Sequence, residues 1–419
     1  MKESKKCVAL LTLALGLWLI AFALTFGLTK HPIGASDLIC GLLLVALGLL
    51  SITPSRVWSG WLVALVGVWL QIAPLVFWAP EALMYLNDTL VGVIAIIFAF
   101  LLTKKKEATT QELLPKGWSY NPSSWSHRIP TALLAMLCWF FSRYMAAFQL
   151  GYIDSIWDPF FAGGTVQVIT STISKNFPVS DAGLGAVCYT LEAILGWQGS
   201  SRRFASMPWL VLAFAFLVIP VGIVSVTLII LQPVVVGAWC TWCLATAASM
   251  LLMIVLTAGE LVAALQVLRE AKQKGGSVWK VLWRGTQMHK SIPNNRPLSK
   301  PSWGFTLPWN LVASLALGIW LMFTPAVLGT RGELAMSYFI LGPIVVAISV
   351  LAFAEVLRSV RYVNILCGLL LILGPWLVPH VCMKCCIATS WIVGFLILIL
   401  ALRRGKISGK YGTWNRFIL

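Results

Sequence analysis

Two cysteines three positions apart, Cys240 and Cys243, lie within the apolar stretch VVVGAWCTWCLATAASMLLMIVL. A Cys-x-x-Cys pair can close into a small disulfide and reopen by exchange with another thiol. At the N-terminus of a helix, the positive end of the helix dipole stabilises the thiolate that performs this exchange. The alternative is two small buried side chains without chemistry. The choice depends on the elements that carry the pair and on the membrane side that they face.

The chain is built from long apolar runs. Of its 419 residues, 59% are hydrophobic and 11% are charged. Apolar runs of about 18 or more residues can cross a bilayer as helices, and these runs lack the alternation of barrel strands. We therefore expect an all-α polytopic membrane protein with about twelve membrane-spanning helices. The predicted spans lie near residues 7–28, 37–53, 58–78, 86–102, 130–151, 181–198, 207–232, 239–262, 307–328, 336–356, 361–378 and 386–402.

Basic residues indicate the orientation in the membrane. The net charge of +17 collects in every second loop, for example in TKKKE, at Arg202 and Arg203, and in RRGKISGK. This is the positive-inside pattern, and it predicts that both termini are cytoplasmic. Contact with anionic membrane lipid explains these charges, so we expect no nucleic-acid partner. The cysteine pair then faces outward from a bacterial-type inner membrane, into a compartment where disulfides form.

The sequence around the pair resembles the vitamin K epoxide reductase family. The resemblance covers residues from about 130 to 262, through DPFFAGGTVQVITSTISKNFPVSDAGLGAVCYTLEAILG and, after one further span, WCTWCLATAASM. It implies a central four-helix redox bundle with Cys240 and Cys243 as the catalytic pair. It also implies that Ser171 and Asp181 contact a membrane quinone, either ubiquinone or menaquinone. Cys243 would then face the quinone, and Cys240 would exchange with an incoming dithiol.

The sequence departs from the family at two relay cysteines that most members carry on the loop before Ser171. Thr165 stands at one position, and the other falls near Trp157. A second thiol cluster lies in VPHVCMKCCIA, on the predicted outward side. Its cysteines are Cys382, Cys385 and Cys386. They are candidates for a substitute redox relay, for a structural disulfide, or for a zinc site with His380.

Both flanks of the redox segment resemble the SPW repeat, a two-helix membrane unit. PSRVWSGWLVALVGVWLQIAP and LPWNLVASLALGIWLMFTP share Trp, then Gly-x-Trp-Leu, then Pro, with weaker copies near Ala9 and Tyr362. Small residues let helices approach closely, so the glycines predict tight hairpins. The predicted domains are two SPW-repeat-like regions, 1–103 and 307–419, a redox domain, 130–265, and two cytoplasmic linkers, 104–129 and 266–306.

Three other charged residues are candidates for a role. Arg143 lies within a predicted span, where it could be functional, snorkel to the interface, or pair with an acid such as Glu192. Asp154 and Asp158 lie at the mouth of the quinone site that the resemblance implies. They could take up a proton released on thiol oxidation. The alternative for both aspartates is a helix cap or loop hydrogen bonds.

The sequence therefore predicts a membrane thiol:quinone oxidoreductase. It would oxidise the dithiol of a thioredoxin-fold periplasmic protein and reduce a membrane quinone. One alternative is a quinone reductase that runs in the opposite direction. Another is a non-catalytic scaffold or transporter with a degenerate redox module, because a fold can persist after its chemistry is lost.

Overall fold

The structure, a computed structural model, describes residues 2–53, 57–103, 114–286, 303–377 and 384–418. Within these ranges the chain is helical and contains no strand. Ten of the described helices are long and apolar enough to cross a membrane. The predicted all-α polytopic membrane fold is thus confirmed. The number of about twelve spans stays a prediction, since the apolar helix Ile387–Leu402 is shorter and α8 has 17 residues.

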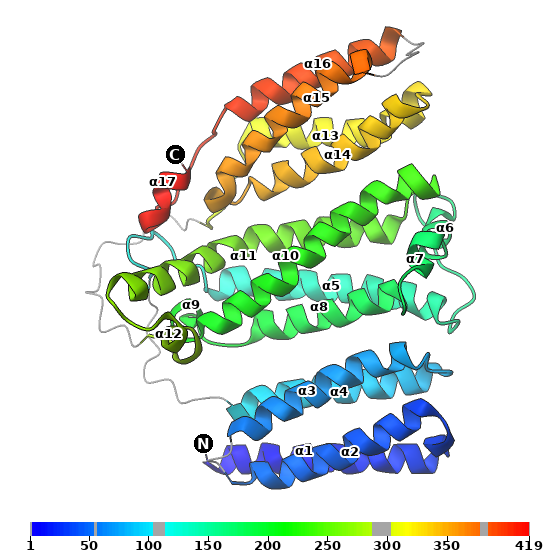
Figure 1. The fold of residues 1–419 in the computed structure, drawn as a ribbon, viewed down its shortest axis with the longest axis vertical. Helices are drawn as coiled ribbons and strands as arrows, with labels where there is room; N and C mark the ends of the chain where they lie inside the picture. Colours follow the sequence, from blue (N-terminus) through cyan, green and yellow to red (C-terminus); the bar gives the residue numbers. More distant parts are fainter. Residues whose placement is uncertain (1, 54–56, 104–113, 287–302, 378–383, 419) are drawn as a thin grey trace. The chain divides into compact units, whose positions relative to one another are not determined.

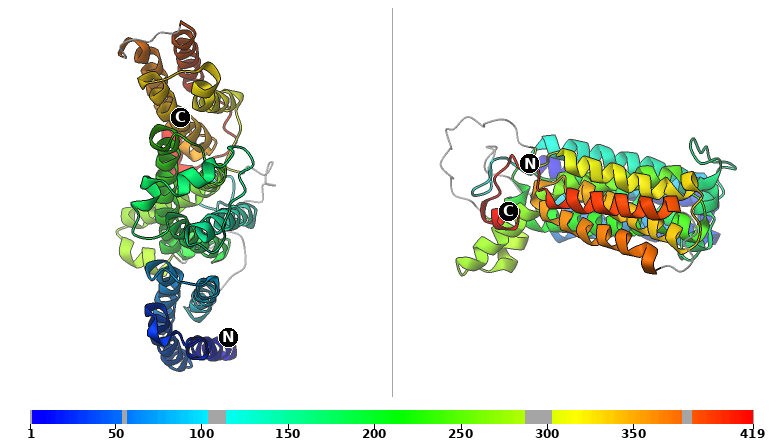
Figure 2. Two further views of the ribbon diagram at one scale, coloured as in Figure 1. Left: turned by 90° about the vertical axis from the view of Figure 1, so that its right-hand side faces the viewer. Right: turned by 90° about the horizontal axis from the view of Figure 1, so that it is seen from above.

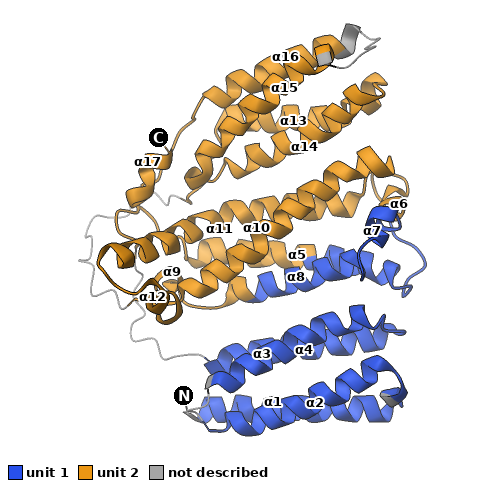
Figure 3. Cartoon of the chain, in the orientation of Figure 1, with its two compact units in different colours: residues 1–110, 139–157, 169–194 blue, residues 111–138, 158–168, 195–419 orange. Residues whose placement is uncertain are grey.

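The chain divides into two compact units (Figure 3). Unit 1 comprises residues 1–110, 139–157 and 169–194, and unit 2 comprises residues 111–138, 158–168 and 195–419. The boundary falls inside three helices: α5 (Trp125–Gln149), α8 (Asp181–Trp197) and α6 (Gly164–Ile169), of which the last residue, Ile169, belongs to unit 1.

Unit 1 contains two helical hairpins that pack against each other, α1 with α2 and α3 with α4 (Figure 1). The part of α5 after residue 138 and most of α8 also belong to this unit. Its remaining elements are α1 (Lys2–Thr25), η1 (Leu28–Lys30), α2 (Pro32–Ser51), α3 (Val57–Val76), α4 (Ala82–Thr103) and α7 (Thr172–Lys175).

Unit 2 holds the pair α10 and α11 and two further hairpins, α13 with α14 and α15 with α16, which lie side by side in Figure 2. Its elements are α6 (Gly164–Ile169), α9 (Arg203–Ser206), α10 (Pro208–Leu231), η2 (Gln232–Val236), α11 (Thr241–Gln273), α12 (Val278–Arg284), α13 (Trp309–Leu328), α14 (Glu333–Leu351), η3 (Glu355–Tyr362), α15 (Val363–Leu377), α16 (Lys384–Leu402), η4 (Gly412–Trp414) and α17 (Asn415–Ile418).

Paired glycines hold each hairpin together. A Cβ built on Gly67 would lie 2.8 Å from the carbonyl oxygen of Gly92, and one on Gly92 would lie 2.7 Å from that of Gly67. The same contact recurs in the other hairpins, so larger side chains would force the helices apart. The four pairs are Gly16 with Gly41, Gly67 with Gly92, Gly318 with Gly342, and Gly368 with Gly394.

α11 is longer than the predicted span 239–262. It continues through LVAALQVLREAKQ to Gln273, and α12 follows, so the predicted linker 266–306 begins with helix. Leu, Ala, Gln, Arg and Glu are strong helix formers, which explains why the helix continues beyond the apolar run. It ends before Gly275, whose φ of 72° suits a glycine after a helix.

Candidate redox site

The cysteine pair stands at the first turn of α11. Cys240 is the N-cap residue, and its Sγ accepts a hydrogen bond from the backbone N–H of Cys243 at 3.1 Å. The two cysteines form a disulfide with their Cα atoms 5.3 Å apart. When the disulfide is reduced, the helix N-terminus and this N–H would stabilise a thiolate on Cys240. The spacing thus gives a closed pair in a position suited to thiol exchange.

A tight connection places this turn. After α10, one turn of π-helix, η2, ends at Gly237, whose φ of 74° lies in the left-handed region that glycine adopts without strain. The side chain of the buried Gln232 then turns back, and its Oε1 accepts from the backbone N–H of Cys240 at 3.0 Å. Gln232 therefore accepts from the backbone N–H of the N-cap residue, Cys240, which has no acceptor within the helix.

The loop before α6 is fastened to the same turn by Asp158. Its Oδ1 accepts from the hydroxyl of Thr241 at 2.5 Å, and its Oδ2 accepts from the backbone N–H of Thr165 at 2.7 Å. The Thr165 hydroxyl in turn accepts from the backbone N–H of Thr241 at 3.3 Å. A Cβ on Gly164 would lie 2.3 Å from the carbonyl oxygen of Trp239, so only glycine allows this approach. We call residues 158–165 the covering loop.

The covering loop bears on which sulfur is accessible. Cys240 is fully buried, whereas Cys243 is partly exposed. The predicted exchange of an incoming dithiol at Cys240 therefore requires a local movement, and we infer that the covering loop moves, because it contacts Trp239 and Thr241 on either side of Cys240. Thr165 occupies one of the positions expected for a relay cysteine, and the structure places it next to the turn that carries Cys240.

Asp158 is poorly suited to take up a proton. Burial alone would raise the pKa of its carboxyl, but hydrogen bonds from Thr241, Thr165 and a further backbone N–H hold that pKa below its ordinary value. The stabilisation that these bonds give is complete above the ordinary pKa of about 3.9 and is lost only as the pH falls through the lowered value. Asp158 therefore stays ionised at neutral pH and acts as a fastening acceptor.

Asp158→Ala should expose Cys240. Removing the acceptor leaves Thr241 and Thr165 without their partner, and a charged hydrogen bond contributes about 1.5 to 3 kcal/mol. With the protein reduced at neutral pH, we expect alkylation of Cys240 to accelerate by about tenfold or more, measured by peptide mass spectrometry. Asp154→Ala is the matched control, because Asp154 is an exposed aspartate in the preceding stretch. Equal Cys240 alkylation in the two variants would show that Asp158 does not fasten the loop.

Ser171 and Asp181 meet through Ser174 in unit 1. Ser171 is the N-cap of α7, and its Oγ accepts from the backbone N–H of Ser174 at 3.4 Å. Asp181 Oδ1 accepts from the Ser174 hydroxyl at 2.9 Å and from Gln149 Nε2 at 2.6 Å. Gln149 Oε1 accepts from the Ser180 hydroxyl at 2.5 Å. This small polar network fixes the entrance of α8.

Comparison with known families agrees with this geometry. Residues 129–258 match the vitamin K epoxide reductase family, and residues 6–102 and 308–404 match the SPW repeat domain. The chain carries a vitamin K epoxide reductase family domain between two SPW repeat domains. This domain supports a quinone-linked thiol oxidoreductase of the membrane. No curated protein and no solved structure matches the chain.

The second SPW repeat domain packs against the disulfide turn of the reductase family domain, within unit 2. The ring centroid of Trp239 lies 5.5 Å from that of Phe323 on α13 and 6.0 Å from that of Phe339 on α14. Cys243 contributes to the same apolar cluster as Met322. The repeat domain thus supplies an apolar wall beside the disulfide, a role that its sequence did not predict.

Several predicted site residues are not tested by this arrangement. Ser171 and Asp181 of the reductase family domain belong to unit 1, whereas Cys240 and Cys243 belong to unit 2, so their shared site stays a prediction. The proposed relay falls outside the described residues. This applies to Cys382 and to the side chains of Cys385 and Cys386.

The suggested pairing of Arg143 with Glu192 is wrong. Arg143 Nη1 donates to the Thr89 hydroxyl at 2.9 Å, and its guanidinium lies 4.4 Å from the centroid of the Tyr85 ring. The hydroxyl and the aromatic face satisfy the cation locally. Both carboxyl oxygens of the buried Glu192 lack a hydrogen-bond partner within the described ranges.

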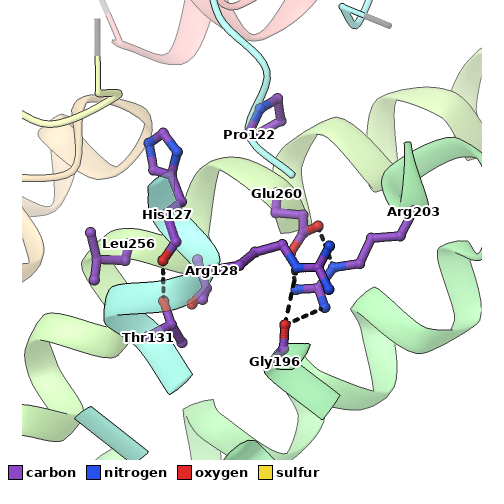
Figure 4. A pocket seen from close by; sticks show the side chains of 9 residues that line it. Pro122, His127, Arg128, Thr131, Gly196, Arg203, Leu256 and Glu260 are labelled. Atoms are coloured by element: carbon purple, nitrogen blue, oxygen red, sulfur yellow. Dashed lines mark hydrogen bonds and ion pairs between the residues drawn. The ribbon is translucent and has the colours of Figure 1, made fainter. Parts of the chain in front are cut away.

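Arg203, counted above among the basic residues of the cytoplasmic loops, is buried and paired with an acid. Its Nη2 lies 2.5 Å from Oε2 of Glu260 on α11 (Figure 4), and Ser123 donates to the other carboxyl oxygen. Arg203 and Arg128 also donate to carbonyl oxygens at the C-terminal end of α8. The signal for this pair is in the sequence, since Glu260 is the one acid in the apolar run before Arg269, and a buried charge needs a partner.

Proposed function

We propose that this protein is a thiol:quinone oxidoreductase that oxidises the dithiol of a thioredoxin-fold protein on the outward side of a bacterial-type inner membrane. The electrons pass to a membrane quinone, ubiquinone or menaquinone. The observation that carries the proposal is the Cys240–Cys243 disulfide at the N-terminus of α11, in the segment that matches the reductase family. The basic residues of alternate loops, which favour cytoplasmic termini, support the outward placement.

The exchange step uses groups that the chain supplies. A thiolate of the partner attacks one sulfur of the disulfide, which forms a mixed disulfide and releases the other sulfur as a thiolate. The second partner thiol then attacks the mixed disulfide, so the partner leaves oxidised and Cys240 and Cys243 are reduced, with the two electrons. The N–H of Cys243 supports negative charge on Cys240 during this exchange.

A quinone supplies the acceptor for these two electrons when it is bound. Ser171 suits it chemically, because this hydroxyl accepts from Ser174 and can still donate its own proton to a carbonyl oxygen. Asp181 is the other residue that the family resemblance implies at the quinone, and its Oδ1 already accepts from Ser174 and Gln149. We infer that Asp181 orients Ser174 and Gln149, and so holds the N-terminal turn that Ser171 caps.

Ser171→Ala should slow quinone reduction by about tenfold to a hundredfold, because a donor to the developing negative charge on the quinone oxygen is lost. Exchange between the cysteine pair and a dithiol should continue at its normal rate. Stopped-flow absorbance of the quinone and thiol trapping separate the two steps. Ser171→Thr retains the hydroxyl and the cap and is the control. If Ser171→Ala only lowers the yield of folded protein and keeps the turnover per folded molecule, Ser171 is a capping residue.

Purified protein tests the function as a whole. We expect membrane extraction to yield bound quinone, and addition of a reduced thioredoxin-fold protein to reduce that quinone. The variant with both Cys240→Ser and Cys243→Ser should retain the quinone and lose its reduction. Net transfer from quinol to the disulfide of the added protein would favour the reverse direction, and a scaffold would show neither bound quinone nor thiol oxidation.

A further inference from the structure

Each of the four SPW hairpins carries a polar residue at an equivalent position, and the redox function does not use these residues. On the second helix of each hairpin, one residue lies four positions before the paired glycine, and so shares its helix face. In the second SPW repeat domain these residues are buried and meet: the hydroxyls of Tyr338 and Ser390 lie 2.6 Å apart in a hydrogen bond. The hairpins of one domain are thus joined through equivalent positions.

The first SPW repeat domain places two acids at these positions. Asp37 on α2 and Asp88 on α4 have no exposed surface, and their side chains are close enough for the two carboxyl groups to interact. Both oxygens of Asp37, and Oδ2 of Asp88, have no donor among the described residues. A hydrogen bond between two carboxyl groups requires a proton on one of them.

The residues next to the two aspartates form equivalent hydrogen bonds between the two hairpins. Trp18 Nε1 on the first hairpin donates to Asn87 Oδ1 on the second at 3.0 Å, and Trp69 Nε1 on the second donates to Ser36 Oγ on the first at 2.9 Å. Asn87 Nδ2 also donates to Asp88 Oδ1 at 3.4 Å. Each aspartate is therefore directly preceded by a residue anchored to the opposite hairpin, which fixes the backbone beside both carboxyl groups.

No described cation neutralises the acids. The described ion pairs join Lys6 to Glu3 and Arg203 to Glu260, and Arg143 on the neighbouring α5 donates to Thr89 instead. The other described titratable groups near the aspartates are the thiol of Cys40 on α2, which both aspartates affect, and the phenol of Tyr152 after α5, which Asp88 affects. Neither brings positive charge.

We propose that Asp37 and Asp88 form a proton-binding site in the membrane interior of the first SPW repeat domain, with one proton held between the two carboxyl groups. Two buried carboxyl groups that interact with each other, and that have no described cation beside them, cannot both be ionised in a low-dielectric interior. The Tyr338–Ser390 contact needs no extra proton, because hydroxyl groups carry their own donors. The two SPW repeat domains therefore differ: one hydrogen bond is permanent, and the other exists only while a proton is bound. This site does not depend on the proposed redox function.

A carbodiimide tests the site in the full-length protein. Dicyclohexylcarbodiimide partitions into membranes and reacts with protonated carboxyl groups, and peptide mass spectrometry locates the adduct. We expect an adduct on Asp37 or Asp88, formed faster at about pH 6 than at about pH 8 and unchanged by sodium or potassium ions. Protection by sodium would mean that a metal cation occupies the site, and no adduct on either residue at either pH would also overturn the proposal.

Variants test the shared proton. In Asp37→Asn the new amide can donate to Asp88 without a bound proton, so labelling of Asp88 should fall by about fivefold or more. Asp88→Asn should act in the same way on Asp37. Tyr338→Phe, which removes the equivalent contact of the second domain, should leave the labelling of Asp37 and Asp88 unchanged. Undiminished labelling of Asp88 in folded Asp37→Asn protein would contradict the shared proton.

Infrared spectroscopy of the unmodified protein keeps the test independent of the variants. A proton between the carboxyl groups gives the carbonyl stretch of a neutral carboxylic acid, which shifts in heavy water. Labelling all aspartates with ¹³C, Asp37 and Asp88 included, should move this band. An ionised aspartate gives no band there, so the shift reports a protonated aspartic acid. A spectrum without an aspartic acid band would overturn the proposal even if both variants failed to fold.

Discussion

Replacing Cys243 by Ser is expected to lower oxidation of the partner dithiol by at least about a thousandfold, because the disulfide that accepts the electrons can no longer form. Cys240→Ser should have an equally large effect on turnover. The two variants should nevertheless differ. In Cys243→Ser the remaining Cys240 thiolate, supported at the helix N-terminus, should attack the disulfide of added oxidised partner and hold it as a mixed disulfide, with release of the partner's other sulfur as a thiolate. In Cys240→Ser the remaining Cys243 should instead give a thiolate–quinone charge-transfer absorbance, provided that the proposed quinone is bound.

Non-reducing electrophoresis and mass spectrometry detect the mixed disulfide, and absorbance spectroscopy detects the thiolate. Cys138→Ser is the matched control, because this buried thiol lies outside the Cys-x-x-Cys pair and donates to the backbone oxygen of Thr246 on α11, the helix that carries the pair. It should retain turnover. If Cys243→Ser and Cys240→Ser turn over like the unmodified protein, the pair is structural. A partner trapped on Cys243 instead would reverse the roles of the two sulfurs, consistent with the burial of Cys240.

The membrane architecture could be predicted from the sequence because its causes are local. Lipid requires long apolar helices. The recurring glycines predicted tight hairpins, and the structure shows four of them, each with a glycine pair such as Gly67 and Gly92. The start of α11 could also be placed, since the Cys-x-x-Cys pair stands where an apolar run begins. The end of α11 could not, because hydropathy marks where a helix leaves the membrane and not where it stops.

Contacts between polar groups that are distant in the chain could not be predicted. Thr165 and Thr241 are 76 positions apart, and their hydrogen bond exists only because Gly164 lets the covering loop approach α11. Asp37 and Asp88 were missed for a related reason: each is a single acid in an apolar run, and only the packing of two hairpins makes them a pair. Charge counting alone likewise explained Arg203 by contact with anionic lipid and missed its partner Glu260.

Arg203 and Glu260 should contribute the largest single effect on stability. Arg203 Nη2 and Glu260 Oε2 lie 2.5 Å apart, and both side chains are almost fully buried. Removing one partner of a buried ion pair leaves a charge without compensation and costs about 3 to 5 kcal/mol. Arg203→Ala also removes the donor to the carbonyl oxygens of Leu195 and Gly196. We therefore expect both Arg203→Ala and Glu260→Ala to unfold at much lower denaturant concentration than the unmodified protein.

A double-mutant cycle separates the pair from the packing of its side chains. Arg203→Met combined with Glu260→Leu should recover much of the stability that either substitution alone loses, because well-packed apolar residues can replace a buried ion pair. The coupling free energy, measured by denaturant unfolding in detergent, should be at least about 2 kcal/mol. The exposed pair Lys6 and Glu3, 3.7 Å apart on α1, is the control and should show no measurable coupling. Additive losses for Arg203 and Glu260 would mean that each acts through the α8 carbonyls or Ser123 rather than through the other.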